Sequence, residues 1–142
     1  MEEKQILKYD EIQIGEELET QYELTPDLVK EYAQGIDDYN SWFLQDCPTL
    51  GGAVAHPTLI AYQNLQLLKT KYSLAGCVDV RHDIQFLHPA RLGQTIRVKG
   101  RLADKYIKRE REYLVVEHIT LDEEGWELCR DRQTLLLRYQ KR

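Results

Sequence analysis

The sequence predicts an α+β fold, in which one curved antiparallel sheet wraps around a long, apolar central helix. Apolar residues alternate along the first part of the chain, and two helical patterns follow this segment. Nearly everything after Gly76 alternates again, as strands do. A strand, two helices and a run of strands together predict a sheet whose helices gather on one of its faces.

The first predicted elements are a strand and a short helix. Residues 9–24 have a strand-like pattern, in which Gly15 marks a turn or bulge. Thr25 suits an N-cap and Pro26 the first helical position, and apolar residues then continue at helical spacing. This helix is predicted to end near Gly35.

Residues 35–52 show no period, and loops of such length are often functional. Pro57 then opens the predicted central helix. Apolar residues cover most of its circumference, as in a helix that a sheet encloses: Leu59, Ile60, Tyr62, Leu65, Leu67 and Leu68. Strands are predicted at 78–86, 96–100, 113–121 and 126–139, with turns at Gly93 and Gly125.

The length favours one domain that spans residues 1–142. The polar N-terminus and the unpaired cysteines lead us to expect a cytoplasmic protein. The net charge of -5 gives no general attraction for nucleic acid or an anionic membrane surface. No apolar run approaches the ~20 residues of a membrane span. Cys47, Cys77 and Cys129 form no C-x-x-C pair, so we expect reduced thiols rather than a disulfide framework or a zinc site.

Four short segments, in this order, resemble the MaoC-like branch of the hot-dog superfamily. They are Ile14-Gly15-Glu16, Asp38-Tyr39-Asn40, Ala55-His56-Pro57 and the stretch from Phe86 to Gly93. The resemblance spans nearly the whole chain and implies a single hot-dog domain. It also implies an enoyl thioester hydratase or 3-hydroxyacyl dehydratase that acts on acyl-CoA or acyl-carrier-protein substrates without a cofactor.

In active members of this family the loop follows the outline G-D-x-N-P-x-H, and its aspartate and histidine position the attacking water. Asp38 and Asn40 match this outline, whereas Ser41 replaces the proline and Phe43 stands at the histidine position. The reaction needs one group to take a proton from water and another to supply one at the α-carbon. The resemblance therefore implies Asp38 as a catalytic residue and leaves its partner missing. A loop carboxylate that caps a turn is the alternative.

The helix start is commonly A-H-G in the family, where backbone N–H groups bind the thioester oxygen. Pro57 has no N–H, so a donor from Thr58, Gly51 or Gly52 is expected to replace it. With Asn40, these residues are the expected substrate-binding set. His56 is expected to supply the missing proton, and a satisfied structural hydrogen bond is its alternative role.

No spacing of histidines and carboxylates predicts a metal site, and His82, His88 and His118 are expected to be surface or cross-strand residues. We expect a homodimer or higher homo-oligomer, paired through a sheet edge near residues 113–121. A hetero-oligomer with a second hot-dog subunit is the alternative. The alternative functions are a non-catalytic acyl-binding subunit, which Phe43 and Pro57 favour, and a hot-dog thioesterase.

Overall fold

The computed structural model describes residues 3–40, 43 and 52–138. Ser41, Cys47 and Gly51 lie outside these residues. The elements are β1 (Gln5–Ile6), η1 (Tyr9–Glu11), β2 (Glu17–Glu23), α1 (Pro26–Gly35), α2 (Pro57–Asn64), α3 (Gln66–Lys69), β3 (Tyr72–Ser73), β4 (Val78–Phe86), β5 (Thr95–Lys108), β6 (Arg111–Leu121) and β7 (Glu127–Leu136).

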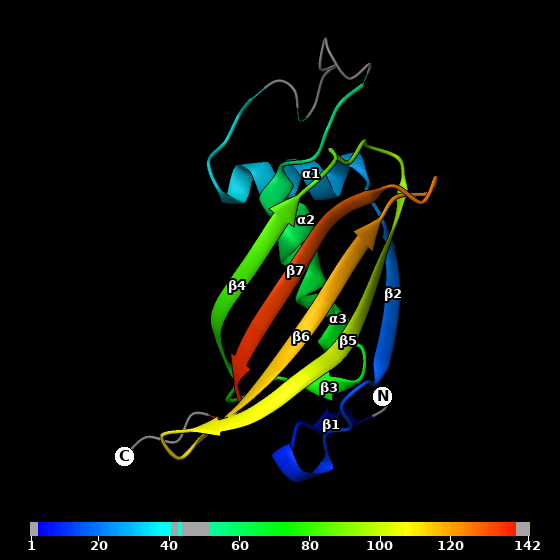
Figure 1. Ribbon diagram of the computed structural model, residues 1–142. Helices are drawn as coiled ribbons and strands as arrows, with labels where there is room; N and C mark the ends of the chain where they lie inside the picture. The colour runs from blue at the N-terminus through cyan, green and yellow to red at the C-terminus, as the bar shows by residue number, and fades with distance from the viewer. Residues whose placement is uncertain (1–2, 41–42, 44–51, 139–142) are drawn as a thin grey trace.

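A five-stranded sheet of order β2-β5-β6-β7-β4 forms the body of the molecule, and all its neighbouring strands are antiparallel. Helices α2 and α3 run along one face of this sheet, and α1 crosses near the start of α2 (Figure 1). Strands β1 and β3 form a small parallel pair beside it. The α+β class and the antiparallel sheet with its helices on one face are therefore confirmed.

The long central helix is not present, because two short helices, α2 and α3, meet at Leu65. The Leu65 N–H donates to the carbonyl of Tyr62 at 3.1 Å, three residues back, which tightens the chain and ends the α-helical ladder of α2. Leu67 and Leu68 are buried as expected, but Tyr62 is half exposed.

Helix α3 approaches the sheet closely at Gly100. A Cβ atom at this position would lie 2.2 Å from Leu67 Cδ2 and 3.2 Å from the carbonyl oxygen of Glu117. Only a residue without a side chain fits here while Leu67 keeps its place. Gly100 is therefore a packing residue in the middle of β5.

The N-terminal segment departs from the strand predicted over residues 9–24. Residues 9–11 form the 3-10 turn η1, and only Glu17–Glu23 form a strand. Residues 12 and 14 would lie on the same face of a strand, but Ile12 is buried and Ile14 is exposed, so their spacing does not reflect a strand. Gly15 provides the expected turn, with a φ of 95°, and its N–H donates to the Leu102 carbonyl at 2.8 Å.

The predicted edge near residues 113–121 is wrong, because β6 is paired on both sides, with β5 and β7. The edges of the sheet are β2 and β4. Alternating apolar residues indicate a strand with one buried face. Interior strands and edge strands both have such a face, so the alternation does not distinguish them. Strand β4 is nonetheless unusual, since it exposes Val78, Val80, Ile84 and Phe86.

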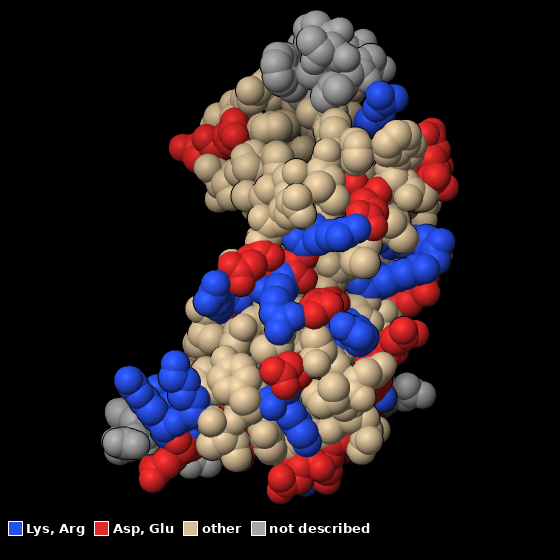
Figure 2. Space-filling model, in the orientation of Figure 1, with Lys and Arg blue, Asp and Glu red and all other residues tan. Residues whose placement is uncertain are grey.

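The outer face of the sheet carries interspersed acidic and basic side chains (Figure 2). The strand register aligns Glu17, Arg101, Glu117, Arg132 and Asp83 in one row of alternating charge. These residues border a shallow hollow of about 1110 Å³, which contains neither Asp38 nor His56. The described helices include none long and apolar enough to cross a membrane.

Candidate functional site

The end of helix α1 places Asp38. The Asp38 N–H donates to the Ala33 carbonyl at 2.9 Å, and the Asp37 N–H donates to the Gln34 carbonyl at 3.2 Å. This pair of bonds is a Schellman motif, in which the residue after the helix adopts the left-handed conformation. Asp37 has that conformation, with a φ of 58°, although glycine is the usual residue there. The backbone of Asp38 is thereby anchored to α1.

The Asp38 side chain also organises the loop that follows. Its Oδ1 accepts a hydrogen bond from the backbone N–H of Asn40 at 3.2 Å. This is an Asx turn, the structural role that was considered as an alternative for Asp38. The second oxygen, Oδ2, faces the start of α2.

His56 is the N-cap of helix α2, and its Nδ1 accepts a hydrogen bond from the Thr58 N–H at 3.2 Å. The structural role considered for this histidine is therefore present. The other ring nitrogen, Nε2, lies 3.4 Å from Asp38 Oδ2. The structure thus brings together the two residues that were expected to be catalytic, although they are separated in the sequence.

Aromatic rings surround the imidazole. Phe43 is buried, and its ring centroid lies 5.2 Å from that of His56. Tyr32, on α1, has its ring centroid 6.0 Å away on a tilted plane. The position at which the family carries a histidine is therefore occupied by a hydrocarbon ring that packs against the histidine of the helix start.

A further hydroxyl pair extends the site beyond His56. Thr58 Oγ1 lies 2.7 Å from His56 Nδ1, and Tyr32 Oη lies 2.7 Å from Thr58 Oγ1. The four residues form a continuous chain of polar contacts, from α1 through the start of α2 to the loop at Asp38. Tyr32 was not identified from the sequence, where its helical spacing indicated only an apolar face.

The expected substrate-binding residues have different surroundings. Asn40 lies two residues after Asp38 on the loop. Gly52 is half-buried on the segment that leads to α2, and none of the described residues lies within 4 Å of the position that a Cβ would take. Gly51 is outside the described residues. The Thr58 N–H, one of the candidate oxyanion donors, is already bonded to His56 Nδ1. Its role toward a substrate stays a prediction.

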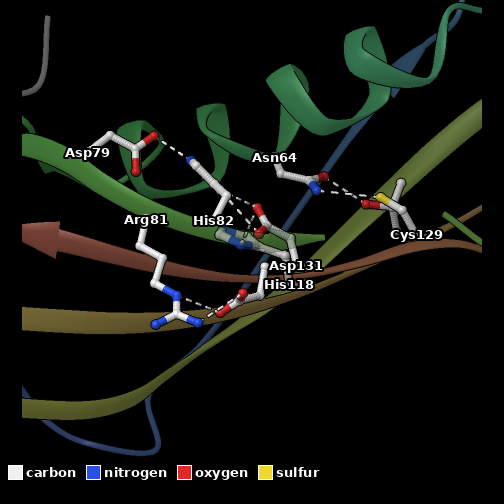
Figure 3. A network of polar contacts seen from close by, with 9 residues as sticks. Asn64, Asp79, Arg81, His82, His118, Cys129 and Asp131 are labelled. Atoms are coloured by element: carbon white, nitrogen blue, oxygen red, sulfur yellow. Dashed lines mark hydrogen bonds and ion pairs between the residues drawn. The ribbon is translucent and has the colours of Figure 1, made fainter. Parts of the chain in front are cut away.

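A second polar cluster lies on the helix-facing side of the sheet (Figure 3). His82 Nδ1 lies 2.9 Å from Asp131 Oδ2, and His82 Nε2 makes a short contact with Asp79. His118 Nδ1 lies 3.8 Å from the same Asp131 oxygen. His118 and Asp131 are buried, whereas His82 is partly exposed at the β4 edge. The cross-strand role expected for His82 and His118 is present, but His118 is not a surface residue.

Burial and neighbouring charges together shift the pKa values of this cluster. It lowers the pKa of His118 to about 4, and the charge of His82 adds to this effect. Burial also raises the pKa of Asp131, against the opposing effect of His82. For His82, burial favours the neutral ring, but the hydrogen bond to Asp79 and the charge of Asp131 outweigh it and raise the pKa.

Asn64 at the end of α2 extends the cluster into a polar layer. Thr120 Oγ1 donates to Asn64 Oδ1 at 2.7 Å, and Asn64 Nδ2 lies 3.6 Å from Cys129 Sγ. Along β7, Asp131 and the buried Gln133 lie between Cys129 and Leu135, which belong to two different hydrophobic clusters. The layer thus separates the core into two parts. Among the described residues, no group of three or more histidine, cysteine or carboxylate side chains is arranged to hold a metal ion.

The similarity of this chain to known proteins lies in its structure. No protein-family model and no curated protein matches the sequence. The unliganded R-hydratase PhaJ1 of Pseudomonas aeruginosa aligns with a TM-score of 0.83 at 15% identity, over 96% of this chain and 89% of that one. The MaoC-like dehydratase of Rhodospirillum rubrum aligns with a TM-score of 0.75 at 16% identity, over 95% and 99%.

A third similar structure is the HadBC complex, a 3R-hydroxyacyl-ACP dehydratase of Mycobacterium tuberculosis. One of its chains aligns with a TM-score of 0.73 at 14% identity, over 87% of this chain and 96% of that one. Identities this low establish architecture rather than activity. The chain therefore has the hot-dog fold that MaoC-like dehydratases and R-hydratases share, which confirms the fold implied by the four short segments.

Proposed function

We propose that this protein is a hydro-lyase, which adds water to a trans-2-enoyl thioester or removes it from the 3-hydroxy form. The observation that carries the proposal is the 3.4 Å contact between Asp38 Oδ2 and His56 Nε2 at the start of α2. The similar structures include an R-hydratase and a 3R-hydroxyacyl-ACP dehydratase, which supports this class of reaction at the level of the fold.

The two residues have complementary roles in the proposed reaction. Asp38 takes a proton from water as the water oxygen bonds to C3 of the enoyl group, and His56 supplies the proton that C2 gains. One molecule of water is added, and no oxidant or reductant is needed. In the family outline both groups belong to one loop, whereas here the proton donor comes from the helix start.

The substrate is an acyl thioester of coenzyme A or of a carrier protein. Asn40, Gly51, Gly52 and Thr58 remain the proposed binding residues. Because the Thr58 N–H is engaged by His56, the Gly51–Gly52 segment is the better candidate to donate to the thioester oxygen. A glycine at position 52 suits the close approach of a ligand to the backbone, and none of the residues that the structure describes would contact a Cβ there.

Hydration of crotonyl-CoA by the purified protein tests the proposal. Asp38→Asn and His56→Ala should each lower kcat by roughly 10²–10⁴-fold while thioester binding persists, since proton transfer of this kind contributes about that much. Asp37→Asn is the matched control, because it removes the neighbouring carboxylate and keeps a residue that tolerates a positive φ. Unchanged turnover in both Asp38→Asn and His56→Ala would reject this site.

The second candidate is a non-catalytic acyl-binding subunit, which the burial of Phe43 at the family histidine position favours. Phe43→His distinguishes the two functions, because it restores the family outline beside Asp38. A rise in hydration supports a reaction site, whereas tight binding of crotonyl-CoA with no turnover in either protein supports the binding subunit. Release of thiol from acetyl-CoA would instead indicate a thioesterase.

We also propose that two copies pair through β4. This edge strand exposes four apolar residues, Val78, Val80, Ile84 and Phe86, and an unpaired edge with such residues is suited to continue the sheet into a second copy. Ile84→Glu should shift sedimentation from dimer to monomer, whereas Glu17→Gln on the opposite edge should not. A wild-type monomer at micromolar concentration contradicts the pairing.

A further inference from the structure

The contacts of Thr58 determine which ring nitrogen of His56 carries hydrogen. A peptide N–H cannot rotate, and that of Thr58 is directed at His56 Nδ1 at 3.2 Å. A hydrogen on Nδ1 would face this N–H directly, so Nδ1 must be the acceptor. In a neutral ring the hydrogen is then on Nε2, the nitrogen that lies 3.4 Å from Asp38 Oδ2.

The same constraint orients two hydroxyl groups. Thr58 Oγ1 lies 2.7 Å from Nδ1, and since Nδ1 only accepts, the threonine hydroxyl must donate to it. The oxygen of Thr58 is then free to accept from Tyr32 Oη, also at 2.7 Å. The hydrogen bonds therefore run in one direction, from Tyr32 through Thr58 to His56 Nδ1, and the opposite ring nitrogen, Nε2, lies 3.4 Å from Asp38 Oδ2.

We propose that Tyr32 and Thr58 are positioning residues that hold His56 as the Nε2–H tautomer and form a proton relay to it. This inference rests on the proposed function, because it identifies how His56 can act as a proton donor there. As Nε2 gives its proton to substrate C2, Nδ1 takes the Thr58 hydroxyl hydrogen, and Thr58 takes that of Tyr32. Solvent returns a proton to Tyr32 and receives the one that Asp38 took from water, so the protons balance.

The relay explains why a histidine at this position can replace the loop histidine of the family outline. A neutral imidazole that lost its only N–H hydrogen would become an anion, which is costly without a second proton source. Thr58 is that source at Nδ1, and its contact with Tyr32 is exposed to solvent, from which the proton can be restored. Phe43 packs against the ring and offers no competing acceptor.

The tautomer is measurable without substrate, by the imidazole ¹⁵N chemical shifts of histidine-labelled protein. His56→Gln identifies the His56 signals among those of the 4 histidines. We expect an unprotonated Nδ1 and a protonated Nε2 at His56. An Nδ1–H tautomer overturns the inference, whether or not the protein hydrates crotonyl-CoA.

The relay itself is tested by removing one hydroxyl at a time. Tyr32→Phe should shift the His56 Nδ1 resonance and lower kcat about tenfold or more with little change in KM. Thr58→Val should do the same, and Thr58→Ser, which returns the hydroxyl group, should recover most of the kcat that Thr58→Val loses. Tyr62→Phe is the matched control, because this half-exposed ring lies 6.3 Å from Tyr32 and outside the chain of contacts.

The outcomes separate this inference from the proposed function. If the wild type hydrates crotonyl-CoA but Tyr32→Phe and Thr58→Val leave kcat unchanged, the relay is wrong and the hydratase stands. If the wild type has no turnover, the proposed function fails. The His56 Nδ1 chemical shift in Tyr32→Phe, compared with that in Tyr62→Phe, then tests whether Tyr32 polarises His56 through Thr58. Equal shifts in the two variants would show that it does not.

Discussion

The contact between Gly100 and Leu67 offers a sharp test of how α3 packs on the sheet. Gly100→Ala places a methyl group 2.2 Å from Leu67 Cδ2 and 3.2 Å from a backbone oxygen of β6, so side chain or backbone must move. Overpacking of this kind costs about 1–3 kcal/mol of unfolding free energy. Leu67→Ala removes a fully buried side chain and should cost about 2–5 kcal/mol.

The double variant, which combines Gly100→Ala with Leu67→Ala, is the informative one. Without the Leu67 side chain, the methyl group added by Gly100→Ala enters the space that Cδ2 occupied, so the overpacking disappears and the cavity is smaller. The combined loss should therefore be at least about 1 kcal/mol less than the sum of the single losses, as expected for residues in contact.

Urea unfolding at one fixed protein concentration measures these losses, because assembly also affects apparent stability. Gly35→Ala is the control, since no described residue outside its own helix and its chain neighbours lies within 4 Å of the position that a Cβ would take. Single-variant losses that add within about 0.5 kcal/mol would mean that the two residues are independent, and the close approach of α3 to β5 would then be wrong.

Two further predictions concern charge and backbone conformation. The pKa of His82 is raised above its ordinary value, so its contribution to stability is fully present below about pH 6.5 and is lost as pH rises through the folded-state pKa. The difference in unfolding free energy between the wild type and His82→Gln, measured by urea titration, should therefore shrink from mildly acidic to alkaline pH. A difference that does not change with pH would contradict the contacts of His82 with Asp79 and Asp131. Asp37→Val should destabilise the protein by about 1–2 kcal/mol, because a β-branched residue resists the left-handed conformation, whereas Asp37→Gly should not destabilise it. Equal stabilities of the two variants in urea unfolding would contradict the Schellman motif as the anchor of Asp38.

Local signals in the sequence were sufficient for most of the fold. Thr25 and Pro26 define the start of α1, and the Thr25 hydroxyl accepts from the Leu28 N–H at 3.1 Å as an N-cap should. The turn at Gly93 is also present, with a φ of 87°. These features depend on neighbours within a few residues, which the sequence displays directly.

Features that depend on distant residues were missed. The break between α2 and α3 at Leu65 was not expected, because helical periodicity across it is unbroken. The interior position of β6 depends on strand order, which alternation within one strand does not report. For the site, the pairing of Asp38 with His56 was expected from the resemblance, whereas the contact of Tyr32 was not, because its hydroxyl meets Thr58 on another helix.

The hairpin of β5 and β6 has a consequence for how the chain folds. Its strands pair from Lys108 and Arg111 at the turn to Arg97 and Leu121 at the far end, around a two-residue connection. Both connecting residues, Arg109 and Glu110, have positive φ values, of 51° and 64°, which match the twist of a tight hairpin. Contacts so close in the chain cost little loop-closure entropy, so this hairpin should form early in refolding, and β7 can then add along β6 before the distant β2 and β4 close the sheet.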